Sequence, residues 1–218
     1  MAFTITPFLP HSAAAIPADV KTGGCHIFVW RHHLSLEELA ALCEEENVSL
    51  KGNDLCAKRL TERLSSLFMV RRLLGPGVTL AHTPAGCPLL QGSPLHISIS
   101  HTEGTYAVSL AQARHGIDIE LPTPRALRLR AKFLNEEEMG ISLGNGWTTE
   151  NEATALWCAK EAAFKCFSSE SITHIGQILL HQPQPGASLT ARTATCSSTA
   201  YPVDITRTDD LIIAVCHP

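Results

Sequence analysis

A helical segment over residues 149–167 constrains the fold most strongly, because it carries a lysine inside its apolar stripe. At about 100° per residue, Lys160 lies in the middle of that stripe. The stripe consists of Ala153, Leu156, Trp157, Phe164 and Phe167. An unpaired buried ammonium costs several kcal/mol. Lys160 therefore either extends to water along its aliphatic stem or has an anionic partner.

The composition is that of a folded protein without a strong overall charge. Of 218 residues 44% are hydrophobic, and 17 basic against 21 acidic side chains give a formal net charge of −4. This balance argues against nucleic-acid and anionic-membrane partners, so any anion site must be local. The eight cysteines form no C-x-x-C pair, which favours reduced thiols. With neither a signal peptide nor an apolar span, we expect a soluble, cytoplasmic protein.

Several segments have the patterns of strands. An apolar run over 25–30 predicts one strand, and alternation over 96–110 around a turn at 102–104 predicts a hairpin. We expect residues 115–120 to continue this hairpin as a third strand. A last hairpin is predicted over 200–217.

Helices are predicted between these strands. One begins at Leu34, with Ser35 and Glu38 forming a capping box, and another runs from about residue 55 to 74 and stops at Gly75. Arg71, near the end of that second helix, either caps its last carbonyls or contacts an anion.

The second half of the chain has helical signals as well. Residues 132–140 predict a new helical segment. Thr149 and Glu152 predict a capping box for the helix that carries Lys160.

Two segments with similar sequences indicate an internal repeat. Residues 97–103 and 203–209 share an alternating pattern, and each follows a long helix at a distance. The pattern suggests two similar α+β halves. Chance similarity between two strands that end in polar turns is the alternative.

Asp118 and Glu120 are two apart on a predicted strand, so both carboxylates leave the same face. Carboxylates this close repel each other unless a cation lies between them, and Mg²⁺ prefers oxygen ligands. The alternative for this pair is a solvated outer face.

Glu161 and Lys165 lie at the edge of the apolar stripe, where a helix borders a cleft. Glu161 is a candidate third oxygen ligand or base, although the two residues could also form an ordinary i, i+4 salt bridge. Together with Lys160 and the strand carboxylates, they suggest a site for a metal-bound phosphate or pyrophosphate. His101 is a candidate phosphate contact or a structural residue.

The motifs resemble those of a known family. G-I-D-I-E at 116–120 and W-C-A-K-E-A-A-F-K at 157–165 are similar to the paired motifs of the 4'-phosphopantetheinyl transferases. A-G-C-P-L at 85–89, S-I-S-H at 98–101 and K-F-L-N-E-E-E at 132–138 resemble further elements of that family, in the same order.

The chain length resembles the larger class of this family, and this resemblance implies an α+β pseudo-dimer. Its two similar halves would be residues 1–112 and 113–218, the latter with the metal-binding motifs. Each half would pack a long helix on a small antiparallel sheet, with the active site and coenzyme A in the cleft between them. A monomer is expected, whereas the small class is trimeric.

The resemblance also implies an activity. The enzyme would transfer the 4'-phosphopantetheine arm of coenzyme A to a serine of an acyl or peptidyl carrier protein and release adenosine 3',5'-bisphosphate. Asp118, Glu120 and Glu161 would hold Mg²⁺ on the pyrophosphate. Glu161 or a water on the metal would take the serine proton, and Lys165 would stabilise the developing charge.

The resemblance assigns further residues to coenzyme A. Lys160 and Lys165 would contact its phosphates. His101 would bind the 3'-phosphate, with Ser100 of the same motif and Arg71 as further candidates on the nucleotide side.

One position departs from the family pattern. Leu67 stands where the first-half helix of the family often has an arginine, and Arg63, Arg71 and Arg72 are candidates to replace it. This departure leaves open a degenerate, non-catalytic homologue that binds carrier proteins or coenzyme A. A metal-dependent phosphohydrolase that uses the same carboxylates, with water as the nucleophile, is a second alternative.

The predicted partner is acidic, because carrier proteins typically are. Arg125, Arg128 and Arg130 form a candidate docking patch for it. A solvated helix face is the competing interpretation of these arginines.

Overall fold

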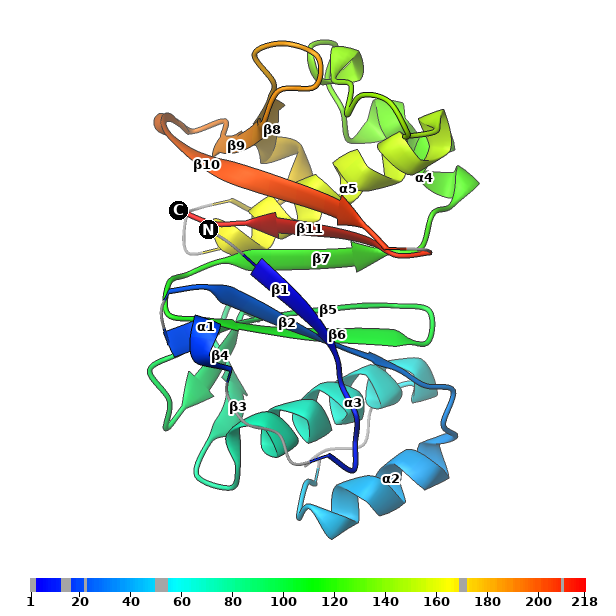
Figure 1. Ribbon diagram of the computed structural model, residues 1–218, viewed down its shortest axis with the longest axis vertical. Coiled ribbons are helices and arrows are strands. Elements are labelled where there is room, and N and C mark those ends of the chain that lie inside the picture. The colour runs from blue at the N-terminus through cyan, green and yellow to red at the C-terminus, as the bar shows by residue number, and fades with distance from the viewer. Residues whose placement is uncertain (1–2, 13–16, 22, 50–54, 169–171, 209) are drawn as a thin grey trace. The chain divides into compact units, whose positions relative to one another are not determined.

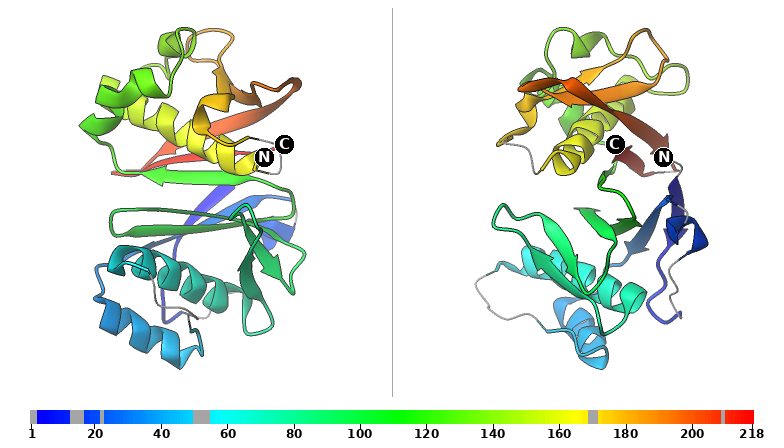
Figure 2. Two further views of the ribbon diagram at one scale, coloured as in Figure 1. Left: turned by 180° about the vertical axis from the view of Figure 1, so that it is seen from behind. Right: turned by 90° about the vertical axis from the view of Figure 1, so that its left-hand side faces the viewer.

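The computed structural model describes residues 3–12, 17–21, 23–49, 55–168, 172–208 and 210–218. The chain divides into two compact units, Met1–Ala113 and Arg114–Pro218, drawn in Figures 1 and 2. Each unit contains one helix of 18 residues and a sheet of its own. Both units are therefore mixed α and β, as the sequence predicts.

The first unit combines two sheets with three helices among its described residues. Its strands are β1 (Phe3–Pro7), β2 (Cys25–Arg31), β3 (Thr79–His82), β4 (Pro88–Gln91), β5 (His96–Thr102) and β6 (Thr105–Ala111). Its helices are α1 (Ala18–Lys21), α2 (Leu36–Glu45) and α3 (Ala57–Leu74). The larger sheet has the order β1-β2-β6-β5, and β3 pairs with β4. Helix α3 packs against β6 and α2.

The main sheet of this unit is not purely antiparallel, so that prediction is wrong. β1 runs parallel to β2, with Phe3 opposite Cys25 and Pro7 opposite Val29, whereas the other pairs are antiparallel. A parallel pair requires the chain to cross back to the same end of the sheet. The segment that contains α1 makes that crossover.

Local signals in the first unit predict its elements well. Ser35 Oγ accepts a hydrogen bond from Glu38 N at 3.2 Å, and Glu38 Oε2 accepts one from Ser35 N at 2.8 Å, which confirms the capping box. Helix α3 ends before Gly75, whose φ of 78° few other residues adopt. The predicted hairpin forms as β5 and β6.

The second unit wraps an antiparallel sheet around one long helix. Its strands are β7 (Gly116–Glu120), β8 (Ile178–His181), β9 (Leu189–Thr193), β10 (Cys196–Arg207) and β11 (Ile212–Cys216). Its helices are α4 (Pro124–Leu129) and α5 (Thr149–Cys166), with 3₁₀ turns at Arg130–Lys132, Glu138–Gly140 and Ile175–Gln177. The strand order is β7-β11-β10-β9-β8. Helix α5 packs across β7, β11 and β10, as Figure 1 shows.

The prediction that residues 115–120 extend the β5–β6 hairpin is wrong. These residues form β7, which pairs with β11 near the end of the chain, Asp118 lying opposite Ala214. The hydrogen-bond partner of β7 is thus far away in sequence, and a local pattern cannot identify it. The predicted last hairpin is confirmed as β10 and β11.

The predicted capping box of α5 is also wrong, by one residue. Thr148, not Thr149, caps the helix, and its Oγ accepts a hydrogen bond from Asn151 N at 3.2 Å. The Glu152 carboxylate instead accepts a hydrogen bond from Leu143 N at 2.6 Å. Either of the two consecutive threonines, Thr148 or Thr149, could cap the helix. Because the Glu152 carboxylate is bound to the loop at Leu143 N, it does not form a capping box with Thr149, and Thr148 is the cap. Before this helix, residues 132–140 form no α-helix: a 3₁₀ turn ends at Lys132, and another spans Glu138–Gly140.

The two units share a strand order. In the first, β2-β6-β5 are neighbours, and in the second, β7-β11-β10 are neighbours with the same antiparallel pairing. The similar segments 97–103 and 203–209 begin in β5 and β10 and so occupy equivalent places in this order. In the first unit the long helix α3 precedes β5 and β6 in the chain, and in the second unit the long helix α5 precedes β10 and β11.

No helix among the described residues is both long enough and apolar enough to cross a bilayer.

Gly116, at the start of β7, makes the tightest contact between strand and helix. A Cβ at this position would overlap Ala162 O of α5 and would lie 2.6 Å from Cys166 N. Both neighbours are backbone atoms of the helix, so they cannot rotate away. Only glycine lets β7 lie this close to α5.

Gly116→Ala should therefore lower the free energy of unfolding by at least about 2 kcal/mol, as overpacking does when the backbone must shift. Urea denaturation measures the change. Gly140→Ala is the matched control, because a Cβ there meets nothing within 4 Å. Equal stability of the two variants would contradict the contact.

Candidate active site

The carboxylates of β7 lie next to helix α5. Asp118 is buried on this strand, and Glu120 is partly exposed at its end. Trp157 of α5 donates a hydrogen bond from Nε1 to Glu120 Oε1 at 3.2 Å, and its ring packs edge-on against Phe133. Glu120 is thus held in place by an indole that is itself packed.

Lys165, the last residue but one of α5, joins this helix to β7. Its Nζ donates hydrogen bonds to Ile117 O at 2.9 Å and to Asp118 Oδ1 at 2.7 Å. The lysine side chain is partly exposed, whereas that of Asp118 is buried. The sequence left open an ordinary i, i+4 salt bridge between Glu161 and Lys165, whereas in the structure Lys165 forms its ion pair with Asp118 of β7.

Glu161 lies within the electric field of these two groups. Burial raises the pKa of its carboxyl, the negative charge of Asp118 raises it further, and Lys165 lowers it in part. The Cys158 thiol, one turn before, also has a pKa raised by burial and by the charges of Asp118 and Glu120. Both shifts show that negative charge collects between β7 and α5.

The donor set fits a hard divalent cation in its chemistry. All three predicted ligands, Asp118, Glu120 and Glu161, offer carboxylate oxygens, and their mutual repulsion is what a cation would relieve. Among the described residues, however, no three His, Cys, Asp or Glu side chains are gathered closely enough to form a ligand set. Lys165 and Trp157 hold two of the carboxylates instead.

Lys160 has a partner that the sequence interpretation did not assign. Its Nζ donates to Glu138 Oε2 at 2.8 Å and to Ile178 O at 2.8 Å, and the Lys160 and Glu138 side chains are each 1% exposed. Glu138 also accepts hydrogen bonds from the backbone N–H groups of Leu180 and Asn135. This buried ion pair places Lys160 in the interior of the second unit. We therefore no longer assign Lys160 to a phosphate of coenzyme A.

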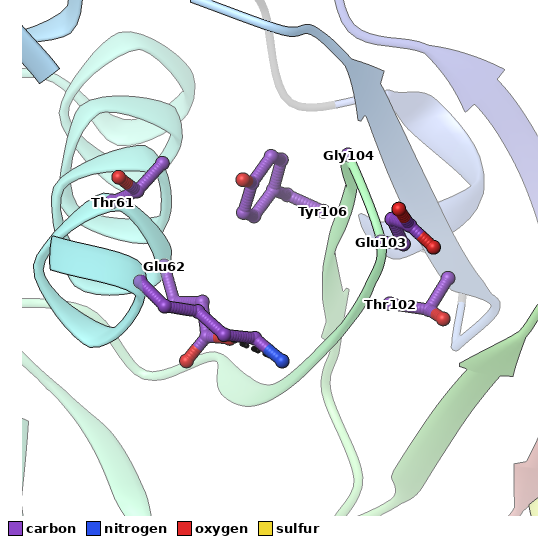
Figure 3. A pocket seen from close by; sticks show the side chains of 7 residues that line it. Thr61, Glu62, Thr102, Glu103, Gly104 and Tyr106 are labelled. Atoms are coloured by element: carbon purple, nitrogen blue, oxygen red, sulfur yellow. Dashed lines mark ion pairs between the residues drawn. The ribbon is translucent and has the colours of Figure 1, made fainter. Parts of the chain in front are cut away.

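The predicted nucleotide-side residues do not form one cluster within the first unit. His101 Nδ1 lies 3.4 Å from Glu62 Oε1 on α3. Ser100 is buried and, as the neighbouring residue on β5, faces the opposite side of the sheet. Arg71 is nine residues beyond Glu62 on α3, about 13 Å along the helix axis. Of these three residues, His101 lies beside Glu62, which is one of the residues lining the pocket drawn in Figure 3.

The predicted carrier-docking arginines are exposed. Arg125 and Arg128 lie on α4, and Arg130 begins the 3₁₀ turn that follows. Exposure agrees with both a docking patch and a solvated helix face, so the patch stays a prediction.

One family model matches the second unit. Residues 114–216 match the model of the 4'-phosphopantetheinyl transferase superfamily. The matched region contains β7 and α5, and with them Asp118, Glu120, Glu161 and Lys165. The superfamily resemblance of the sequence is thus supported where the carboxylates lie. No curated protein matches the chain.

Sequence reasoning missed three residues that shape this site. Trp157 was assigned to the apolar stripe, yet its N–H group orients Glu120. Cys158 lies beside the carboxylates, and Glu138 neutralises Lys160. Glu138 did have a signal, because it ends the K-F-L-N-E-E-E motif, whereas nothing in the sequence links Trp157 to Glu120.

The buried ion pair predicts the effect of removing one partner. Lys160→Met should lower the free energy of unfolding by about 3–5 kcal/mol, because it leaves the Glu138 charge buried and uncompensated. The double variant Lys160→Met with Glu138→Gln should recover part of that loss. Urea denaturation measures both.

Lys132→Met, at an exposed position, is the control for loss of a lysine charge. If Lys160→Met keeps normal stability but binds coenzyme A weakly, Lys160 is a phosphate contact after all.

Proposed function

We propose that this protein transfers the 4'-phosphopantetheine arm of coenzyme A to a serine of an acyl or peptidyl carrier protein. One observation carries the proposal: Asp118, Glu161 and Lys165 meet between β7 and α5, inside the region that matches the superfamily. This cluster combines a buried carboxylate, a carboxyl with a raised pKa and a lysine. Phosphoryl chemistry uses such groups for charge neutralisation and proton transfer.

In this proposal Asp118, Glu120 and Glu161 would hold Mg²⁺. When bound, the ion supplies positive charge to the pyrophosphate of coenzyme A and to the carboxylates. The hydrogen bond from Trp157 Nε1 holds one oxygen of the Glu120 carboxylate.

Glu161 takes the proton of the attacking serine. Its carboxylate is partly buried beside Asp118 and Lys165, which makes it the candidate proton acceptor of this cluster. The serine oxygen bonds to the phosphorus that bears the pantetheine arm, and the bond from that phosphorus to the bridging oxygen breaks. Lys165 stabilises the charge on the leaving nucleotide from its position beside Asp118.

The first unit completes the proposed enzyme as the other half of a pseudo-dimer. The shared strand order β2-β6-β5 and β7-β11-β10 supports this arrangement. We assign the nucleotide end of coenzyme A to the first unit, near His101. A monomeric, cytoplasmic enzyme that docks its acidic carrier on Arg125 and its neighbours belongs to the same proposal.

Intact-protein mass spectrometry of an apo carrier protein, incubated with this enzyme, coenzyme A and Mg²⁺, tests the proposal. The wild type should add one phosphopantetheine, and chelation of the metal should prevent the addition. Asp118→Asn and Glu161→Gln should slow transfer at least about 100-fold with the fold intact by circular dichroism. Glu136→Gln, on the exposed surface of the same unit, should leave the rate unchanged.

Two other outcomes would contradict the proposal. Breakdown of coenzyme A without any carrier would indicate a phosphohydrolase. Carrier binding without modification, while coenzyme A stays intact, would indicate a non-catalytic protein.

A further inference from the structure

Helix α5 holds both carboxylates of β7 from one of its faces. Trp157, Glu161 and Lys165 are spaced four residues apart and therefore lie on the same side of the helix. The first of them donates a hydrogen bond to Glu120 Oε1, and the last donates one to Asp118 Oδ1. Each strand carboxylate thus already has one oxygen bound to a donor of α5.

Lys165 supplies positive charge to Asp118. Its Nζ lies 2.7 Å from Asp118 Oδ1, and the Asp118 side chain is only 8% exposed. A carboxylate that is so far removed from water is costly unless a cation pairs with it. The charge of Lys165 also reaches Glu161, whose pKa is raised by burial and by Asp118 and is lowered in part by Lys165. Lys165 therefore offsets part of the negative charge between β7 and α5.

A divalent cation would compete with this lysine. Mg²⁺ needs its oxygen ligands at about 2.0–2.1 Å, and an ammonium beside the same carboxylate repels the ion. In the part of the chain that the structure describes, the carboxylates are also not drawn together into a ligand set. Formation of a ligand set therefore requires at least one carboxylate to change its partner on α5.

Lys165 can change partner more easily than Trp157 can. Its side chain is 29% exposed, and its ammonium lies at the end of a flexible four-carbon stem. The Trp157 ring, in contrast, packs edge-on against Phe133 with the ring centroids 5.1 Å apart. Movement of the indole would disturb this packing, whereas movement of the ammonium breaks only its hydrogen bonds to Asp118 and Ile117.

A phosphate oxygen is a suitable new partner for the ammonium, because lysine binds phosphate groups as a point charge. Transfer of Lys165 to a phosphate removes its charge from Asp118, and a divalent cation at Asp118 then replaces that charge. Either event alone would leave one charge poorly compensated. Each event therefore favours the other, which is a coupling between two binding sites.

We propose that Lys165 is an exchangeable counter-ion of Asp118, which turns its ammonium from Asp118 Oδ1 to a phosphate of the substrate when a divalent cation binds, so that cation and substrate bind cooperatively. The inference rests on the proposed function, in which the pyrophosphate of coenzyme A is that phosphate. It gives Lys165 a second task, which is to keep the cation affinity of the free protein low. No covalent bond forms or breaks in this exchange.

Titration of the full chain with Mn²⁺ alone, followed by electron paramagnetic resonance of the free ion, tests the competition. Lys165→Gln should bind Mn²⁺ at least about tenfold more tightly than wild type, because the amide keeps a hydrogen-bond donor but carries no charge. Lys165→Met, which also lacks the donor, should bind Mn²⁺ more tightly as well. Lys132→Gln is the matched control at an exposed position of the same unit and should keep the wild-type affinity.

The same titration at saturating coenzyme A tests the exchange, after correction for the Mn²⁺ that coenzyme A binds by itself. Because Lys165 is then on a phosphate, wild type and Lys165→Gln should bind Mn²⁺ with affinities within about threefold of each other. A melting temperature that rises more per added Mn²⁺ in the variants than in wild type reports the tighter binding even where a variant is less stable.

Mn²⁺ binding by Lys165→Gln and Lys165→Met that is no tighter than that of wild type would overturn the inference, as would the absence of Mn²⁺ binding by all three proteins. Tighter binding by Lys165→Gln that persists at saturating coenzyme A would overturn the exchange onto a phosphate.

Transfer assays separate this inference from the proposed function. If the Mn²⁺ results are as expected but wild type modifies no carrier protein, the inference stands and the proposed function fails. If wild type modifies a carrier protein while Lys165→Gln leaves the Mn²⁺ affinity unchanged, the proposed function stands and the inference fails.

Discussion

The close approach of β7 to α5 at Gly116 is the constraint on which the chemistry of the second unit depends. With no side chain at this position, the strand lies directly on the helix backbone. Lys165 can then reach Ile117 O and Asp118 Oδ1 from the same helix that carries Glu161. A wider separation would break these short hydrogen bonds and reduce the burial that, together with the Asp118 charge, raises the pKa of Glu161. The close contact at Gly116 therefore also sets the distances between the charged groups of β7 and α5.

The two units share a strand order but carry different side chains at its equivalent positions. In the second unit Asp118 lies opposite Ala214, which lies opposite Ile205. The equivalent row in the first unit is Phe28, Val108 and Ile99. By the same register, Trp30 of the first unit corresponds to Glu120 of the second. The Trp30 ring packs against Phe68 of α3. Aromatic packing thus replaces the carboxylates in the first unit, which leaves one acidic cluster per chain at these positions.

Features that depend on neighbouring residues could be predicted from the sequence. The Ser35 cap, the end of α3 at Gly75 and both predicted hairpins are set by local hydrogen bonds and backbone preferences. The shared face of Asp118 and Glu120 follows from strand geometry alone.

Features that depend on distant residues could not be predicted in this way. Lys160 meets Glu138, which is 22 residues earlier in the chain, and β7 pairs with β11 near the end of the chain. The apolar stripe correctly indicated that Lys160 is buried, yet it gave no information on which anion pairs with it. Glu62 lies beside His101 because α3 packs on the sheet that contains β5, a contact between distant parts of the chain that no local pattern shows.

The central claim is that the β7 and α5 carboxylates act together as a divalent-cation site. Titration with Mn²⁺, followed by electron paramagnetic resonance of the free ion in the presence of coenzyme A, measures this directly. The account predicts one bound Mn²⁺ per chain and at least about tenfold weaker binding by Glu120→Gln, as expected for loss of a ligand. Stoichiometric binding that Glu120→Gln and Asp118→Asn both leave unchanged would contradict it.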